Sequence, residues 1–93
     1  MTEFSLLSAQ VRAARSLLNW SQSYLADGCM VSRSTIADLE ANKRQPHESS
    51  LYIIMSELNA AGIEFTERGV EFTEIPPKEY VPTGIRQKNS QGN

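Results

Sequence analysis

Apolar residues recur at intervals of three and four along the first sixty residues, which is the spacing that places them on one face of an α-helix. Val11, Ala14, Leu17 and Leu18 form such a face, with Ser8 as the expected N-cap. The pattern predicts four helices, over about residues 9–18, after Ser21, from Ser32 to about Asn42, and from about Leu51 to Gly62.

The second and third helices are predicted to begin in the same way, eleven residues apart. Ser21 and Ser32 are good N-caps, and the apolar residue before each can pack onto one four residues after the cap. Two short helices joined by a tight turn, the second with a polar outer face, fit the major groove of DNA. Sequence-specific DNA binding is therefore the leading hypothesis.

After Gly62 the period changes to two, as in a half-buried strand. Ile63, Phe65, Val70 and Phe72 alternate with polar residues and predict a hairpin, or one strand with an extended arm, that pairs two copies of the chain. From Pro76 onward no periodicity remains, so we expect a disordered tail. The expected organisation is a helical head (residues 1–62), a β element (63–75) and the tail (76–93).

Composition narrows the classes of protein. The 93 residues make one domain with a net charge of −2, and residues 1–56 carry as many basic as acidic side chains. A neutral head can still bind DNA, because backbone N–H groups at helix N-termini also contact phosphates. No apolar run approaches the ~20 residues of a membrane span. Without a signal peptide, and with Cys29 as a single cysteine, the sequence favours a bacterial-type cytoplasm and offers no metal cluster or disulfide.

Several residues carry a resemblance to a known family: Arg12 and Arg15, Trp20-Ser21-Gln22, Leu25-Ala26, Val31-Ser32, Ile36, Leu39-Glu40, Pro46, Leu51 and Ile54. At these spacings residues 10–62 resemble the lambda-repressor-like helix-turn-helix domain, or XRE family. The resemblance implies a mainly α-helical bundle of about four helices with a small C-terminal β element. That family usually has glycine in the turn where this chain has Met30, so either Met30 accepts a strained backbone or the turn has shifted.

The resemblance also implies that the residues opening the second and third helices touch DNA. We expect base reading by Arg33, Ser34 and Asp38, since arginine can pair with guanine and aspartate with cytosine. Phosphate contact or support is expected from Gln22, Ser32, Thr35, Lys43 and Arg44. Arg15 and Glu40 are expected to form a structural ion pair that holds the third helix.

These features favour a transcriptional regulator, most simply a homodimeric repressor that reads a palindromic operator. Its expected partners are double-stranded DNA and a second copy, with RNA polymerase or another protein as further candidates, in a bacterial or phage-encoded, nucleoid-associated setting. No catalytic set or cofactor is indicated. Two alternatives stay open: the antitoxin of a toxin–antitoxin pair, whose tail would fold on a toxin, and a protein-interaction module that lost DNA binding.

Overall fold

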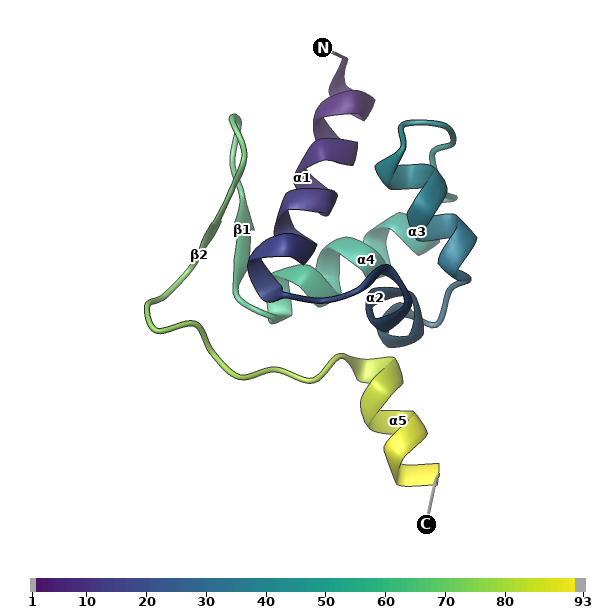
Figure 1. Ribbon diagram of the computed structural model, residues 1–93, viewed down its shortest axis with the longest axis vertical. Helices are drawn as coiled ribbons and strands as arrows, with labels where there is room; N and C mark the ends of the chain where they lie inside the picture. Colours follow the sequence, from purple (N-terminus) through teal and green to yellow (C-terminus); the bar gives the residue numbers. More distant parts are fainter. Residues whose placement is uncertain (1, 92–93) are drawn as a thin grey trace.

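The computed structural model describes residues 2–91, with side chains as far as residue 88. Helices dominate it, and one hairpin stands beside them (Figure 1). The elements are α1 (Glu3–Leu18), α2 (Gln22–Cys29), α3 (Arg33–Glu40), α4 (Glu48–Ala60), β1 (Ile63–Phe65), β2 (Val70–Phe72) and α5 (Thr83–Gln91). The predicted fold class, a mainly helical helix-turn-helix bundle with a small C-terminal β-hairpin, is confirmed.

Helix α1 begins earlier than the sequence analysis expected. Its N-cap is Thr2, whose Oγ1 accepts a hydrogen bond from the N–H of Ser5 at 3.1 Å. The expected cap, Ser8, is buried inside the helix and donates its hydroxyl to the Phe4 carbonyl at 2.9 Å. The extra turns are stabilised because Phe4 and Leu7 pack against the hydrophobic core.

The turn between α2 and α3 has the tight geometry that the sequence suggested. Ser21 and Ser32 cap the two helices by accepting hydrogen bonds from N–H groups three residues ahead, at 3.0 and 3.2 Å. Met30 ends α2 with φ 59°, in the left-handed region. The turn has therefore not shifted, and Met30 accepts a strain of about 1 kcal/mol. Met30 is 60% exposed and is not part of the hydrophobic core.

The hydrophobic core lies between α1, α2, α3, α4 and the first residue of the hairpin. Its fully buried members are Val11, Ala14, Leu25, Ala26, Cys29, Ile36, Leu39, Ile54, Leu58 and Ile63. Val11 and Ala14 lie on the face of α1 that the helical period predicted to be buried, and Leu18 packs against the core. Leu17, which was expected on the same face, is 43% exposed, so that part of the prediction is wrong. Within residues 2–91, no helix is both long enough and apolar enough to cross a membrane.

The hairpin packs its apolar face on its own chain. β1 and β2 are antiparallel, with Ile63 opposite Phe72 and Phe65 opposite Val70, and all four side chains pack on the core. Gln10 of α1 donates from Nε2 to the Thr66 and Gly69 carbonyls at 2.7 and 2.9 Å. The four residues that we expected to pair two chains therefore contribute to the core of one chain.

The C-terminal region departs most from expectation. Instead of a tail without regular structure from residue 76, the chain runs in an extended path to Val81 and then forms α5 against α2 (Figure 1). The order comes from contacts with α2 and α4, which hydrophobic periodicity cannot reveal. Residues 92–93 of the expected tail lie outside the described residues.

Candidate nucleic-acid interface

A polar concavity of about 380 Å³ lies between the outer face of α3 and the loop that leads to α4. Ser32, Ser34, Thr35, Asp38, Arg44, Gln45, Pro46, His47 and Ser50 line it. Two residues expected to read bases therefore meet three expected to support DNA binding at one surface: Ser34 and Asp38 with Ser32, Thr35 and Arg44. Hydroxyl, carboxylate and guanidinium groups there offer both hydrogen-bond donors and acceptors.

The first turn of α3 has its hydroxyl groups held close together. Ser32 Oγ lies 3.0 Å from Ser34 Oγ and 2.9 Å from Thr35 Oγ1, and it also caps the helix. Ser34 is exposed, whereas Thr35 is half-buried. The cap therefore orders the two following hydroxyl groups at the end of α3 that would enter a groove first.

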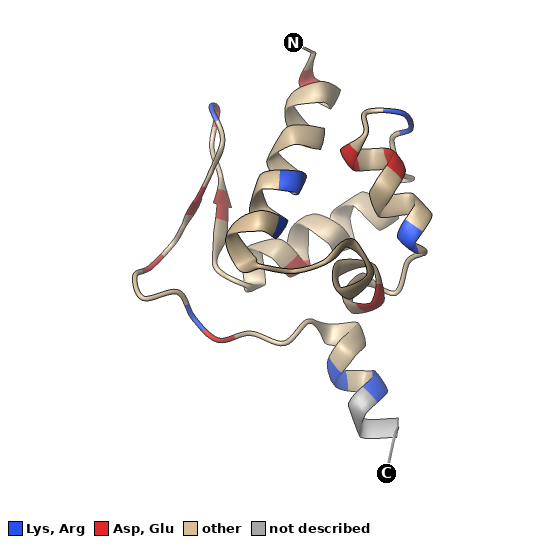
Figure 2. Cartoon of the chain, in the orientation of Figure 1, with Lys and Arg blue, Asp and Glu red and all other residues tan. Residues whose placement is uncertain are grey.

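Basic residues stand at both ends of α3. Arg33 is its first residue, and Lys43 and Arg44 follow its C-terminal end, as the blue segments of Figure 2 show. All three side chains are exposed, and none forms an ion pair with a carboxylate among the described residues. Arg33 and Lys43 stand outside the concavity, whereas Arg44 is part of its wall. Cations at both ends of a helix that lies in a groove can contact phosphates on either side of it.

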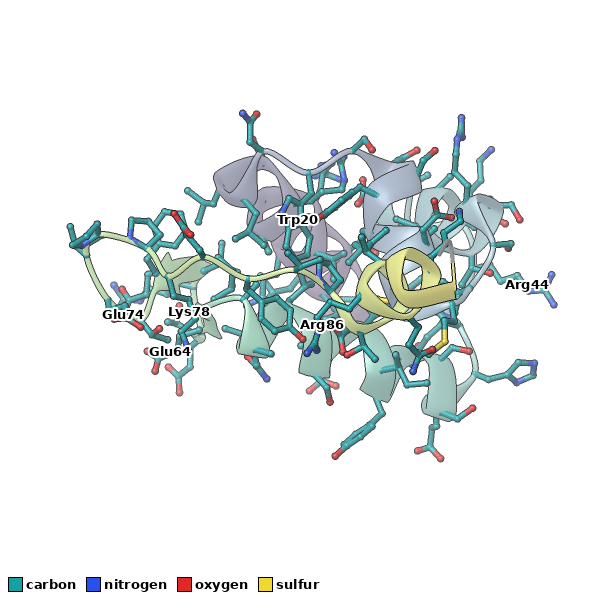
Figure 3. All side chains as sticks on the ribbon, turned by 90° about the horizontal axis from the view of Figure 1, so that it is seen from below. Trp20, Arg44, Glu64, Glu74, Lys78 and Arg86 are labelled. Atoms are coloured by element: carbon teal, nitrogen blue, oxygen red, sulfur yellow. The ribbon has the colours of Figure 1, made fainter. Side chains whose placement is uncertain are left out.

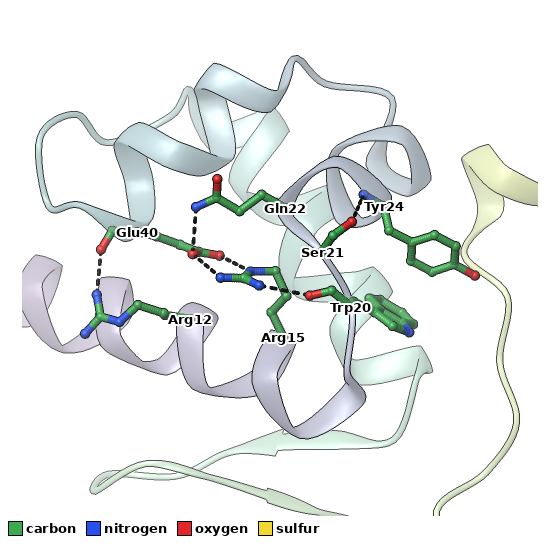
Figure 4. A network of polar contacts seen from close by, with 7 residues as sticks. All are labelled: Arg12, Arg15, Trp20, Ser21, Gln22, Tyr24 and Glu40. Carbon is green, nitrogen blue, oxygen red and sulfur yellow. Dashed lines mark hydrogen bonds and ion pairs between the residues drawn. The ribbon is translucent and has the colours of Figure 1, made fainter.

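A buried carboxylate ties α3 to the helices behind it (Figure 4). Arg15 donates from Nε and Nη2 to the two carboxylate oxygens of Glu40, each at 2.8 Å. Gln22 donates from Nε2 to Glu40 Oε1 at 3.1 Å, and Arg12 donates to the Glu40 backbone carbonyl at 2.7 Å. Since Glu40 is only 3% exposed, this network fixes the end of α3 relative to α1 and α2.

The electrostatics of the pair agree with its geometry. Hydrogen bonding to Glu40 raises the pKa of Arg15 above its usual value; burial acts against this, and the charge of Glu40 adds to it. Gln22, expected to contact a phosphate or support the helix, has its amide nitrogen on Glu40, which leaves its oxygen to accept another bond. Sequence reasoning missed Arg12, whose contact is with a backbone carbonyl and leaves no trace in residue type.

Cys29 lies behind this surface, in the core. Burial raises the pKa of its thiol to about 12, and the charge of Glu57 acts in the same direction. At neutral pH the thiol is therefore protonated and a poor nucleophile. Among residues 2–91, no group of three or more His, Cys, Asp or Glu side chains is placed to hold a metal ion.

Two adjacent capped helices, a polar outward face on the second and cations at both of its ends define a DNA-binding helix-turn-helix. The helix-turn-helix family model HTH_3 matches residues 11–64, which is more than half of the chain. The chain therefore belongs to this XRE-type, lambda-repressor-like family, and it is a DNA-binding regulator of the XRE kind. No curated protein matches the sequence.

Proposed function

We propose that the protein is a sequence-specific transcriptional repressor that acts as a homodimer on a palindromic operator. The polar face of α3, presented beside Arg33, Lys43 and Arg44, is the observation that carries this proposal. In this proposal Arg33, Ser34 and Asp38 read base edges, and Gln22, Ser32, Thr35, Lys43 and Arg44 contact or support the phosphate backbone. The protein has no catalytic role in this function and acts in the cytoplasm.

The neutral charge of residues 1–56 shapes the binding that we expect. Few phosphates are neutralised, so the affinity should fall less steeply with salt than for a strongly basic domain. Discrimination then depends on α3 and on its fixed orientation through Glu40. This supports a regulator that finds short half-sites in pairs, because one short helix reads only a few base pairs.

The hairpin backbone supports the dimeric part of the proposal. The Thr66 N–H donates to the Gly69 carbonyl at 2.9 Å, and the Thr73 N–H donates to the Gly62 carbonyl at 2.8 Å. In this antiparallel pattern Glu64 and Glu71 form a hydrogen-bonded pair. The N–H and C=O groups of the residues directly before and after each of them therefore point to the outer edges of the sheet. An edge of this kind can pair with the same edge of a second copy around a two-fold axis.

The proposal is tested by selecting duplexes from a random-sequence pool and footprinting the protein on the selected DNA. We expect two protected half-sites about one helical turn apart, related by inverted symmetry. Sedimentation of the free protein and of its DNA complex then gives the stoichiometry. Protection of one half-site by a monomer would refute the homodimer, and failure to enrich any sequence would refute specific reading.

The antitoxin alternative loses its main support, because the segment expected to be a disordered tail folds on α2 of the same chain. The interaction-module alternative is decided by the same selection. A wild-type protein that binds no duplex, yet melts cooperatively, would favour it.

A further inference from the structure

Residues 77–91 form a distinct structural unit, which we call the C-terminal clasp. Figure 3 shows it from below, with Lys78 and Arg86 along its path and Arg44 on the side away from the hairpin. The clasp passes α1 and α4 and ends as α5 on α2, the first helix of the helix-turn-helix. It lies outside the hydrophobic core cluster. Two anchors hold it.

The first anchor is the carboxylate of Glu57 on α4. It accepts hydrogen bonds from the Tyr80 hydroxyl at 2.8 Å, the Thr83 N–H at 2.9 Å and the Thr83 hydroxyl at 2.8 Å. Pro82, which precedes α5, has no side-chain oxygen that could cap the helix. Glu57 therefore caps α5 from another helix, and a nine-residue helix is marginal without such support.

The second anchor is a close backbone contact between α2 and the start of α5. Pro82 is fully buried, and a Cβ on Gly28 would overlap its ring. A Cβ on Gly84 would overlap the backbone carbonyl oxygens of Asp27 and Gly28. The contact therefore requires glycine on both sides. Lys88 adds an exposed ion pair with Asp27 at 3.6 Å.

The segment that leads to these anchors is held weakly. In the described part of the chain, residues 74–79 make no hydrogen bond to the helices or the hairpin. Ile75 is 79% exposed. Because none of the clasp residues 77–88 belongs to the hydrophobic core cluster, the clasp can leave α2 without removing a member of that cluster, although α2 then loses its cover at Gly28.

We propose that the clasp is releasable and that only its docked form holds α2 and α3 in the arrangement that binds DNA, a coupling that rests on the proposed function. α2 has eight residues and buries Leu25, Ala26 and Cys29 towards the core. The clasp covers the same helix at Gly28. α2 also carries Gln22 to the Glu40 network. If α2 is loosened, it must be ordered again when DNA binds, and the free-energy cost of that ordering lowers the affinity.

The test uses Gly84→Ala in the full chain. Alanine favours the helical state of α5 itself, but its methyl group blocks docking on α2. Gly69→Ala is the matched control, since a Cβ there meets nothing within 4 Å. Thr83→Val is a second variant, which removes one hydroxyl donor to Glu57 and keeps the branched shape.

The reporter is the native thiol of Cys29, which is 1% exposed and follows Gly28 directly. Its rate of labelling by a small thiol reagent is measured at a temperature far below the melting transition, with and without a duplex selected by the wild-type protein. We expect Gly84→Ala to speed labelling about tenfold through local opening. We expect the affinity of Gly84→Ala for the duplex to fall about tenfold. Thr83→Val should also label faster and bind the duplex more weakly, whereas Gly69→Ala should change neither the labelling rate nor the affinity. Saturating duplex should slow labelling of the wild-type protein.

The outcomes separate the two parts of the proposal. Wild-type labelling rates in both Gly84→Ala and Thr83→Val would overturn the clasp. Faster labelling with unchanged affinity for the selected duplex would overturn the coupling. If the wild-type protein selects no duplex, the proposed function and the coupling both fail, while labelling still decides whether the clasp is releasable.

Discussion

Replacement of Glu40 by alanine is the sharpest test of how the third helix is held. The change removes a carboxylate that is 3% exposed and leaves the guanidinium of Arg15 and the amide of Gln22 without their shared partner. Breaking a fully buried pair costs about 3–5 kcal/mol. The Arg15 side chain is 20% exposed and can recover some hydration. We therefore expect the free energy of unfolding to fall by about 2–3 kcal/mol.

For a domain of this size each kcal/mol corresponds to about 4–8 °C, so the melting temperature should fall by about 10–20 °C. Circular dichroism melts of Glu40→Ala, Glu40→Gln and Glu64→Ala measure it. Glu40→Gln keeps the shape and should lose less. Glu64→Ala is the control, because Glu64 is exposed and faces the like charge of Glu71. A Glu40→Ala melt within about 3 °C of the wild type would refute the reasoning, because it would mean that the network contributes under 1 kcal/mol.

Three further predictions concern reading, titration and strain. Arg33→Ala should weaken binding to a selected duplex by about 1–3 kcal/mol and relax the sequence selectivity at one base pair per half-site. Lys43→Ala should weaken binding to all duplexes alike and reduce the slope of log affinity against log salt concentration by about 1. Gel-shift titrations over a range of salt concentrations measure both effects. Burial raises the pKa of the Cys29 thiol from 9.0 in the unfolded chain to about 12 in the folded chain. The stability that this shift contributes is therefore complete below pH 9 and is lost towards pH 12. In urea unfolding, the stability of the wild type relative to Cys29→Ala should fall by about 1.4 kcal/mol per pH unit in that window, and parallel curves would contradict the shift. Met30→Gly should raise the stability by about 0.5–1 kcal/mol in the same assay while Met30→Ala does not, since only glycine removes the strain at φ 59°.

The local parts of the fold could be predicted from the sequence because their causes are local. Ser21 and Ser32 lie three residues from the N–H groups that they cap, so the cap and the helix are visible in the same short stretch. The period of apolar residues likewise indicated which faces of the helices are buried. The predicted start of α1 is too late. Thr2 is a cap of the same kind, but the first turn that follows it is stabilised by the packing of Phe4 on the core, which is a tertiary contact.

The distant parts could not be predicted in this way. The cap of α5 is Glu57, which precedes Thr83 by 26 residues and carries no marker that distinguishes it from a solvated acid. The two-residue period of the hairpin showed that one face is buried, but it did not show whether that face covers the same chain or a second one. At the candidate interface, residue types suggested Arg33 and Ser34, whereas the contact of Arg12 with a backbone carbonyl required coordinates.

The placement of glycine at position 28 and of methionine in the turn at position 30 leads to an expectation about related chains. Glycine at 28 is required by the neighbouring ring of Pro82, while the backbone conformation at 30 is tolerated by an exposed side chain. In this chain the requirement for glycine therefore lies at a contact with the C-terminal segment and not in the turn. In related chains, small residues at the positions of Gly28 and Gly84 should be gained and lost together, and chains that end before this segment should accept larger residues at the first of them.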